Sequence, residues 1–124
     1  MTFVPKDWGH EYIVTNNEHY CLKILVCEDQ QWSSRGKFHY HRIKDETFLV
    51  INGTLELETI DEDGTIRNGK MQEGESIRIL PGTKHRFRSV GERCSFVEAS
   101  SPDSPSDSVR VDDVPGAESG PSQS

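Results

Sequence analysis

The sequence predicts an all-β protein folded as a single small antiparallel β-barrel. Three observations support this class. No window longer than about ten residues keeps the 3.6-residue apolar period of an amphipathic helix. Short apolar runs recur instead, and turn-forming residues separate them. The chain has 124 residues, which is enough for one domain around one core.

Each expected strand is a short run rich in apolar or β-branched residues. The runs before and around the middle of the chain are 11–15, 20–28, 37–41, 46–51 and 54–60. Asn52-Gly53 separates the last two of these and is typical of a two-residue β-hairpin. The runs 66–71, 76–80, 84–90 and 94–100 complete the series. Regularly spaced strands without helices between them predict an antiparallel barrel or sandwich.

The strand at 46–51 is apolar on both faces, because Phe48 and Val50 alternate with Leu49 and Ile51. A strand with one solvated face would not need this pattern. The outer face is therefore covered either by a second sheet or by another subunit, and a homodimer is expected. Trp8 and Trp32 are expected to pack rather than to bind a ligand.

Composition divides the chain into a barrel domain, 1–100, and an acidic Ser/Pro-rich tail, 101–124, that is at most partly ordered. Within the tail, 109–111 (Val-Arg-Val) has the pattern to pair with an edge strand. The net charge of −7 argues against binding to nucleic acid or to an anionic membrane. Three cysteines without a CxxC pair, no signal-like N-terminus and no apolar stretch of membrane-spanning length predict a cytoplasmic protein.

Four side chains of metal-ligand type occur at spacings that bring them together. His39 and His41 are two residues apart on an expected strand, so they project from the same face. Glu46 begins the next strand after a short connection, and His85 follows the tight turn at Pro81-Gly82. Nitrogen and oxygen donors that leave coordination positions open are typical of catalytic first-row metal sites. The sequence predicts a divalent transition metal, with Mn, Fe, Co, Ni and Zn all open.

These residues resemble the two sequence motifs of the cupin superfamily. The first motif, G-x5-H-x-H-x(3,4)-E-x6-G, is matched from His39 to Gly53, with Ser33 at its opening glycine position. The second, G-x5-P-x-G-x2-H-x3-N, is matched in the glycine and histidine spacing of Gly74, Gly82 and His85. Its final asparagine position is serine here. The resemblance implies a jelly-roll barrel with His39, His41, Glu46 and His85 at the metal-ligand positions.

A narrower resemblance covers most of the chain. The opening Trp-Gly-x-Glu (8–11) and the Asp…Arg-x-Asp segment after the last strand are similar to small cupins akin to type II phosphomannose isomerases. They are also similar to cupin modules attached to sialic-acid synthase-type proteins. This implies a small-molecule substrate, namely a sugar, a sugar phosphate or another polyol or oxyanion.

Two further residues are candidates for catalysis. Glu98 on the last strand would have a raised pKa inside an apolar barrel and would suit a general base. Lys23 lies in the middle of an apolar strand. The parity of either strand leaves two possibilities open, a side chain in the barrel or one in solvent. Lys37 shares the parity of His39 and is expected near the pocket mouth, whereas Lys84, Arg86 and Arg88 are expected on a solvated outer face.

The predicted function is an aldose–ketose isomerisation in which the metal acts as a Lewis acid. Two alternatives remain open. The first is a non-catalytic module that binds or senses a metal or a sugar. The second is a non-haem iron dioxygenase, because the same ligand set also suits Fe(II).

Overall fold

The computed structural model describes residues 1–28 and 30–111, which form two antiparallel sheets. The six-stranded sheet has the order β1 (Thr2–Lys6), β2 (Gly9–Asn16), β3 (Cys21–Cys27), β10 (Cys94–Ser100), β5 (Glu46–Asn52) and β8 (Ser76–Ile79). The five-stranded sheet has the order β11 (Ser108–Val111), β4 (Phe38–His41), β9 (Lys84–Ser89), β6 (Leu55–Ile60) and β7 (Ile66–Met71). This arrangement confirms the predicted all-β class, in its jelly-roll form.

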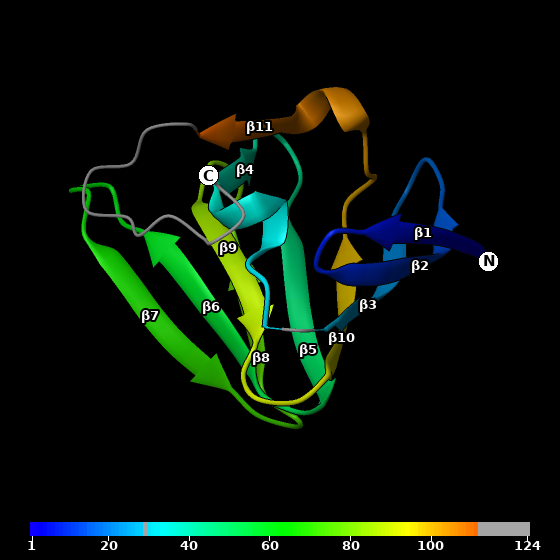
Figure 1. The fold of residues 1–124 in the computed structure, drawn as a ribbon. Coiled ribbons are helices and arrows are strands. Elements are labelled where there is room, and N and C mark those ends of the chain that lie inside the picture. Colours follow the sequence, from blue (N-terminus) through cyan, green and yellow to red (C-terminus); the bar gives the residue numbers. More distant parts are fainter. Residues whose placement is uncertain (29, 112–124) are drawn as a thin grey trace.

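The two sheets form two walls with a core and a cavity between them. Figure 1 shows β7, β6 and β9 on one side and β5, β10 and β3 on the other. Strand β11 lies above β4 at the top of that view, far from the N-terminal strand β1. Two short 3₁₀ helices, η1 (Ser33–Gly36) and η2 (Pro105–Asp107), precede β4 and β11 respectively. Within the described residues, the structure has no helix with the length and apolar character needed to cross a membrane.

The core is built from inward side chains of both sheets. Phe96 packs against Phe48 and Phe87, with ring centroids 4.7 and 5.2 Å away. Trp8 meets Phe87 edge to face at 5.1 Å. Trp8 and Trp32 are both buried, and Trp8 also lines the cavity between the sheets. Phe48 and Phe87 line it as well, so the cavity borders directly on this core.

The expected hairpin across Asn52-Gly53 is wrong, although the turn itself is present. Gly53 has φ +79°, and a Cβ there would lie 2.6 Å from the Arg93 carbonyl oxygen, so glycine is needed. However, β5 pairs with β10 and β8, whereas β6 pairs with β7 and β9. The turn therefore carries the chain from one sheet to the other. The apolar faces of β5 and β6 meet across the core, and the two strands do not pair with each other.

Arg86 does not lie on a solvated outer face, which corrects the expectation for this residue. Its side chain is 2% exposed. The guanidinium carbon lies 4.2 Å from the centroid of the Trp32 ring and 4.7 Å from that of Phe38. Its Nη1 donates to the Gly36 carbonyl at 2.7 Å. The segment around η1 therefore covers the outer face of β9, and Arg86 joins that segment to the sheet.

The segment after β10 is held against the strand that carries the histidine pair. Strand β11 pairs with β4 from Ser108↔His41 to Val111↔Phe38, as expected for the Val-Arg-Val run. The Asp107 carboxylate accepts hydrogen bonds from the backbone N–H groups of Ile43 and Lys44, at 2.8 and 3.0 Å. These bonds fix the connection between β4 and β5. Residues 112–124 of the expected tail lie outside the described residues.

Asp107→Ala is expected to lower the free energy of unfolding by about 1.5–3 kcal/mol, because it leaves two backbone N–H groups without their charged acceptor. Urea unfolding followed by tryptophan fluorescence measures this loss. Ser106→Ala is the matched control, since Ser106 lies in the same short helix and is exposed. Equal stability of the two variants would contradict the role assigned to the Asp107 carboxylate.

Candidate metal centre

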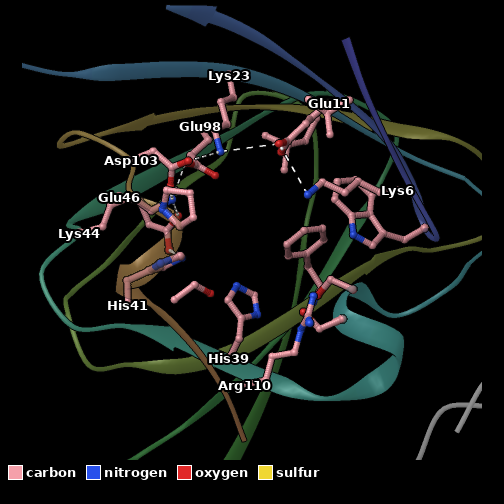
Figure 2. A pocket seen from close by; sticks show the side chains of 18 of the residues that line it. Lys6, Glu11, Lys23, His39, His41, Lys44, Glu46, Glu98, Asp103 and Arg110 are labelled. Carbon is pink, nitrogen blue, oxygen red and sulfur yellow. Dashed lines mark hydrogen bonds and ion pairs between the residues drawn. The ribbon is translucent and has the colours of Figure 1, made fainter. Parts of the chain in front are cut away.

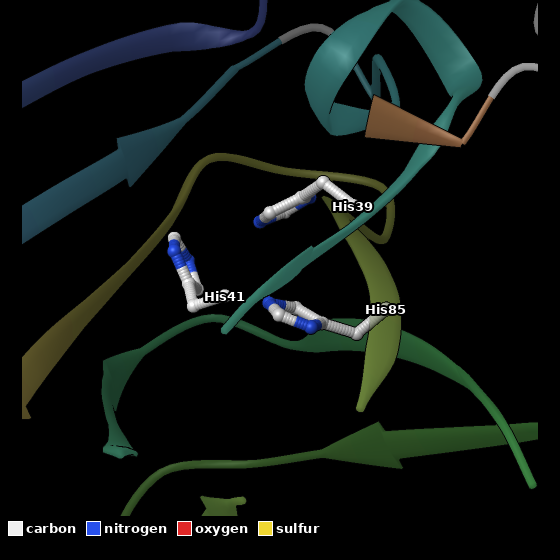
Figure 3. A group of neighbouring side chains, drawn as sticks. All are labelled: His39, His41 and His85. Atoms are coloured by element: carbon white, nitrogen blue, oxygen red, sulfur yellow. The ribbon is translucent and has the colours of Figure 1, made fainter. Parts of the chain in front are cut away.

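Three histidines meet on the inner face of the five-stranded sheet. His39 and His41 project from β4, and the register between β4 and β9 places His85 opposite His39. The ring centroids of His39 and His85 are 4.2 Å apart, and those of His39 and His41 are 5.5 Å apart. One nitrogen from each ring lies within 4.8 Å of the others, so the three side chains could hold one metal ion. Figure 3 shows the rings converging on one point.

Glu46 reaches the same point from the opposite sheet. It is the first residue of β5, and its Oε2 lies 3.5 Å from Nε2 of His41 and 3.3 Å from Nε2 of His85. The short connection from β4 brings it there, and Asp107 fixes that connection. The four residues that the sequence analysis selected are thus brought together, two from β4 and one each from β5 and β9.

Each of the four side chains of this cluster has one buried polar atom without a hydrogen-bond partner among the described residues. Nδ1 of His39, Nδ1 of His41, Oε2 of Glu46 and Nε2 of His85 find no hydrogen-bond partner in the described part of the chain. Nδ1 of His85 lies 2.8 Å from the Thr83 carbonyl oxygen and must donate to it, which leaves the lone pair of Nε2 free. Buried polar atoms are otherwise nearly always paired. Nitrogen and carboxylate donors of this kind fit a first-row divalent metal.

The protonation states of the cluster also suit metal binding. Burial, together with the neighbouring imidazoles, holds the pKa of His39 well below its usual range. Burial and the Lys44 ammonium lower the pKa of His41 to about 4. Burial opposes ionisation of Glu46, but the His85 ring and Lys44 outweigh it and lower the pKa of this carboxyl. Near neutral pH His39 and His41 are therefore neutral and Glu46 is charged, as metal ligands must be.

Three members of the cluster, His39, His41 and Glu46, line a cavity of about 760 Å³, whereas His85 is fully buried next to them. Trp8, Leu25, Phe48 and Phe87 line its apolar part and belong to the core, and eleven Lys, Arg, Asp and Glu side chains also line it. Figure 2 shows His39 and His41 on one side and Glu98, Lys23 and Glu11 on the other. The volume lies in the range of small-molecule sites and is ample for a monosaccharide.

Glu98 and Lys23 both face this cavity, which settles the orientation that strand parity left open. They lie directly opposite each other on β10 and β3 and are 5% and 7% exposed. Glu98 also lies opposite Phe48 of β5, so the three side chains share the inner face of the sheet. Burial, reinforced by the negative charge of Glu46, raises the pKa of Glu98. A raised pKa is expected of a carboxyl group that can take up a proton.

Lys44 connects Glu98 to Glu46 of the candidate ligand cluster, and the sequence analysis did not select it. Its Nζ lies 3.0 Å from Oε2 of Glu98, 3.1 Å from Oδ1 of Asp103 and 3.7 Å from Oε1 of Glu46. Although burial favours a neutral amine, the carboxylates of Glu98, Glu46 and Asp103 raise the pKa of Lys44. Lys44 sits in the connection between two strands, where its position could not be read from alternation.

Asp103 extends the network to Lys23. Its Oδ2 lies 3.0 Å from Nζ of Lys23, which is also 3.7 Å from Oε1 of Glu11. We call Glu11, Lys23, Lys44, Glu46, Glu98 and Asp103 the carboxylate–lysine network. Asp103 belongs to a segment with the composition of a flexible tail, and only the Asp…Arg-x-Asp resemblance pointed to it. Lys37 lines the cavity too, on the side expected from its parity.

Comparison with known proteins places the chain among proteins with the same architecture. A family model described as "Cupin domain" matches residues 28–99. Oxalate decarboxylase from Bacillus subtilis superposes with a TM-score of 0.75 at 16% identity, over 89% of this chain and 30% of that one. The capsular polysaccharide assembling protein CapF from Staphylococcus aureus gives 0.75 at 16% identity, over 87% and 31%. The chain thus spans about a third of the length of these two proteins.

A shorter solved structure matches over most of its length. KdgF from a Halomonas species superposes with a TM-score of 0.65 at 15% identity, over 78% of this chain and 81% of that one. No curated protein matches the sequence. At these identities the solved structures establish the shared fold alone.

Proposed function

The chain belongs to the cupin family, and on that basis we propose that it is a metal-dependent enzyme that isomerises a sugar or sugar phosphate. The observation that carries the proposal is one cavity lined both by side chains of metal-ligand type, His39, His41 and Glu46, and by Glu98, a buried carboxyl with a raised pKa. An aldose–ketose isomerase needs both parts, because it must stabilise negative charge on substrate oxygens and also move a proton between adjacent carbons.

His39, His41, Glu46 and His85 are the residues that would hold the metal. A divalent metal bound there supplies Lewis-acid stabilisation of negative charge on the substrate oxygens. Neighbouring groups of the chain hold these ligands in position. Thr83 fixes the tautomer of His85 through its carbonyl group, and the Lys44 ammonium lies 3.7 Å from the Glu46 carboxylate. Such partners of metal ligands typically change metal affinity about 10- to 100-fold when removed.

Glu98 is the proposed base. It takes the proton from C2, the carbon beside the aldehyde, and returns it to C1, while the proton of the O2 hydroxyl passes to O1, so that aldose and ketose have the same atoms. Lys44 donates a hydrogen bond to Glu98 at 3.0 Å and stabilises the ionised carboxylate before the transfer. Lys23, on the same wall, is the proposed contact for a substrate hydroxyl.

A non-catalytic sugar-binding module is the second candidate. Lys23 and Lys44 are each bound by carboxylates, and every member of the carboxylate–lysine network has a partner within 3.7 Å. A wall of fixed polar groups of this kind is also what recognition of several hydroxyl groups requires. The solved structures are compatible with either candidate, since their names include a decarboxylase and a polysaccharide assembling protein.

A homodimer remains part of the proposal. The outer face of β5 exposes Leu49 and Ile51, and Leu80 beyond β8 is exposed as well. A second copy of the chain would cover these apolar side chains, which a single chain leaves in water.

Proton exchange tests the proposed reaction. Metal-loaded protein is incubated in D₂O with a panel of aldoses and aldose 6-phosphates, and ¹H NMR follows loss of the C2 proton and formation of the ketose. Glu98→Gln is expected to lower kcat by about 10²- to 10⁴-fold, the usual contribution of a general base. The metal content of the variant should stay at the wild-type value.

Glu92→Gln is the matched control, because Glu92 is exposed in the turn before β10. An undiminished rate in Glu98→Gln would remove Glu98 from the mechanism. If no sugar of the panel exchanges with any of the five metals, the isomerase proposal is wrong and the binding module becomes the better account. Oxygen uptake by the iron form would instead assign the dioxygenase reaction.

A further inference from the structure

Arg110 lies beside the histidine cluster without being one of its ligands. Strand β11 pairs with β4 so that Arg110 is directly opposite His39 and Ser108 is directly opposite His41. Residues opposite each other in an antiparallel pair project from the same face, with Cβ atoms about 4.5–5.5 Å apart. Arg110 accordingly lines the same cavity as His39, and Figure 2 shows the two side chains on the same wall.

The bonding of Arg110 differs from that of other cavity cations. Lys6 and Lys23 lie within 4 Å of Glu11, Arg35 is bound to Asp7, and Lys44 is bound to Glu98. Across residues 1–28 and 30–111, Arg110 forms no ion pair and no hydrogen bond through its side chain. A guanidinium group carries five N–H donors arranged to bind an oxyanion in a bidentate manner.

The charge of the whole cavity favours an anionic ligand. Six lysine and arginine side chains and five carboxylates line it. A divalent metal at the histidine cluster adds two positive charges, so the loaded cavity is cationic although the chain carries a net charge of −7. An anion would therefore be repelled by much of the surface and attracted to the cavity.

The backbone of Arg110 is held in place before any ligand arrives. The Asp107 carboxylate is bonded to the connection after β4, and the pairing of β11 with β4 continues past Arg110 to Val111. Because the strand is already anchored, its backbone loses little further conformational entropy when a ligand binds.

We propose that Arg110 binds the anionic group, a carboxylate or a phosphate, of a polyhydroxylated substrate whose other oxygens face the histidine cluster. This inference rests on the proposed function, because it assigns a charge to the substrate of that site. Lys37, the residue directly before β4, lines the same cavity.

Calorimetric titration of the zinc-loaded protein tests the assignment without requiring turnover. The probes are D-gluconate, D-mannose 6-phosphate and neutral D-mannose. Wild-type protein is expected to bind at least one of the two anions more tightly than D-mannose, and the preferred anion decides between carboxylate and phosphate. Arg110→Gln should weaken binding of that anion about 10- to 100-fold, as expected for loss of a charge-assisted hydrogen bond. Its affinity for D-mannose and its zinc content should stay at the wild-type values.

Arg67→Gln is the matched control, because Arg67 is an exposed arginine of β7 that does not line the cavity. Equal anion binding by the two variants, or a wild-type protein that prefers neither anion to D-mannose, would overturn the inference. Different results would overturn the role of Arg110 and the isomerase reaction. Turnover that is independent of Arg110 overturns only the role of Arg110, whereas Arg110-dependent anion binding without proton exchange overturns only the isomerase reaction.

Discussion

His41→Ala is expected to abolish stable metal binding. Wild-type protein, purified without a histidine tag, should contain about one transition metal per chain by elemental analysis, and the variant should contain almost none. The expected loss of affinity exceeds the roughly 10- to 100-fold effect of changing a partner of a ligand, because a donor atom itself is removed. Nε2 of His41 also lies 3.5 Å from Oε2 of Glu46, so removal of the His41 ring should leave Glu46, a second ligand, less well held in place.

His19→Ala provides the control, since this histidine side chain is 77% exposed and lies in the turn before β3. It should keep the wild-type metal content. Metal retained by His41→Ala at the wild-type ratio would show that the ion is bound elsewhere. If both proteins stay metal-free after incubation with Mn, Fe(II), Co, Ni or Zn, the metal site does not exist.

Lys44→Met is expected to lower the free energy of unfolding by about 3–5 kcal/mol, the usual result of breaking a buried ion pair from one side. The ammonium group of Lys44 lies within 4 Å of three carboxylates, and its side chain is 3% exposed. Its loss leaves these negative charges close together in a region that water reaches poorly. Urea unfolding followed by tryptophan fluorescence measures the change, because Trp8 and Trp32 are buried.

Lys70→Met is the surface control, and its stability should differ from wild type by no more than about 0.5 kcal/mol. The double variant Lys44→Met/Glu98→Gln should regain part of the stability, since it removes one of the charges left unpaired. A double-mutant cycle then gives the coupling between the two residues. Lys44→Met with the stability of Lys70→Met would mean that the network is open to solvent.

The sequence was sufficient to group the four candidate ligands and to place the described strands other than β1 (Thr2–Lys6), because most of these features depend on residues close together in the chain. His39 and His41 share a face through the period of two, and Glu46 can reach them because its connection is short. The cupin motifs then located His85. The inward direction of Glu98 and Lys23 could not be predicted, since it depends on which face of each strand meets the second sheet.

Other predictions were wrong or missing because they depend on contacts between segments that are distant in the sequence. The residues Asn52-Gly53 were enough to predict the turn. The residues around it, however, contain no information that β6 pairs with β9. The alternation of side chains along the strand predicted that Arg86 faces solvent. The segment with Trp32 that buries it lies about fifty residues away in the chain. Lys44 and Asp103 lie outside the alternating strands, so only the folded structure shows that they meet at 3.1 Å.

The pairing of β4 with β11 also bears on how the protein folds. The strand that carries His39 and His41 is bonded along its length to residues that follow it by about seventy positions, whereas its register with β9 rests on His39↔His85. Contacts between such distant segments require closure of long loops and form slowly. During synthesis, β1 to β10 all leave the ribosome before β11. The site is therefore expected to be among the last parts of the protein to become ordered, after the aromatic core has formed.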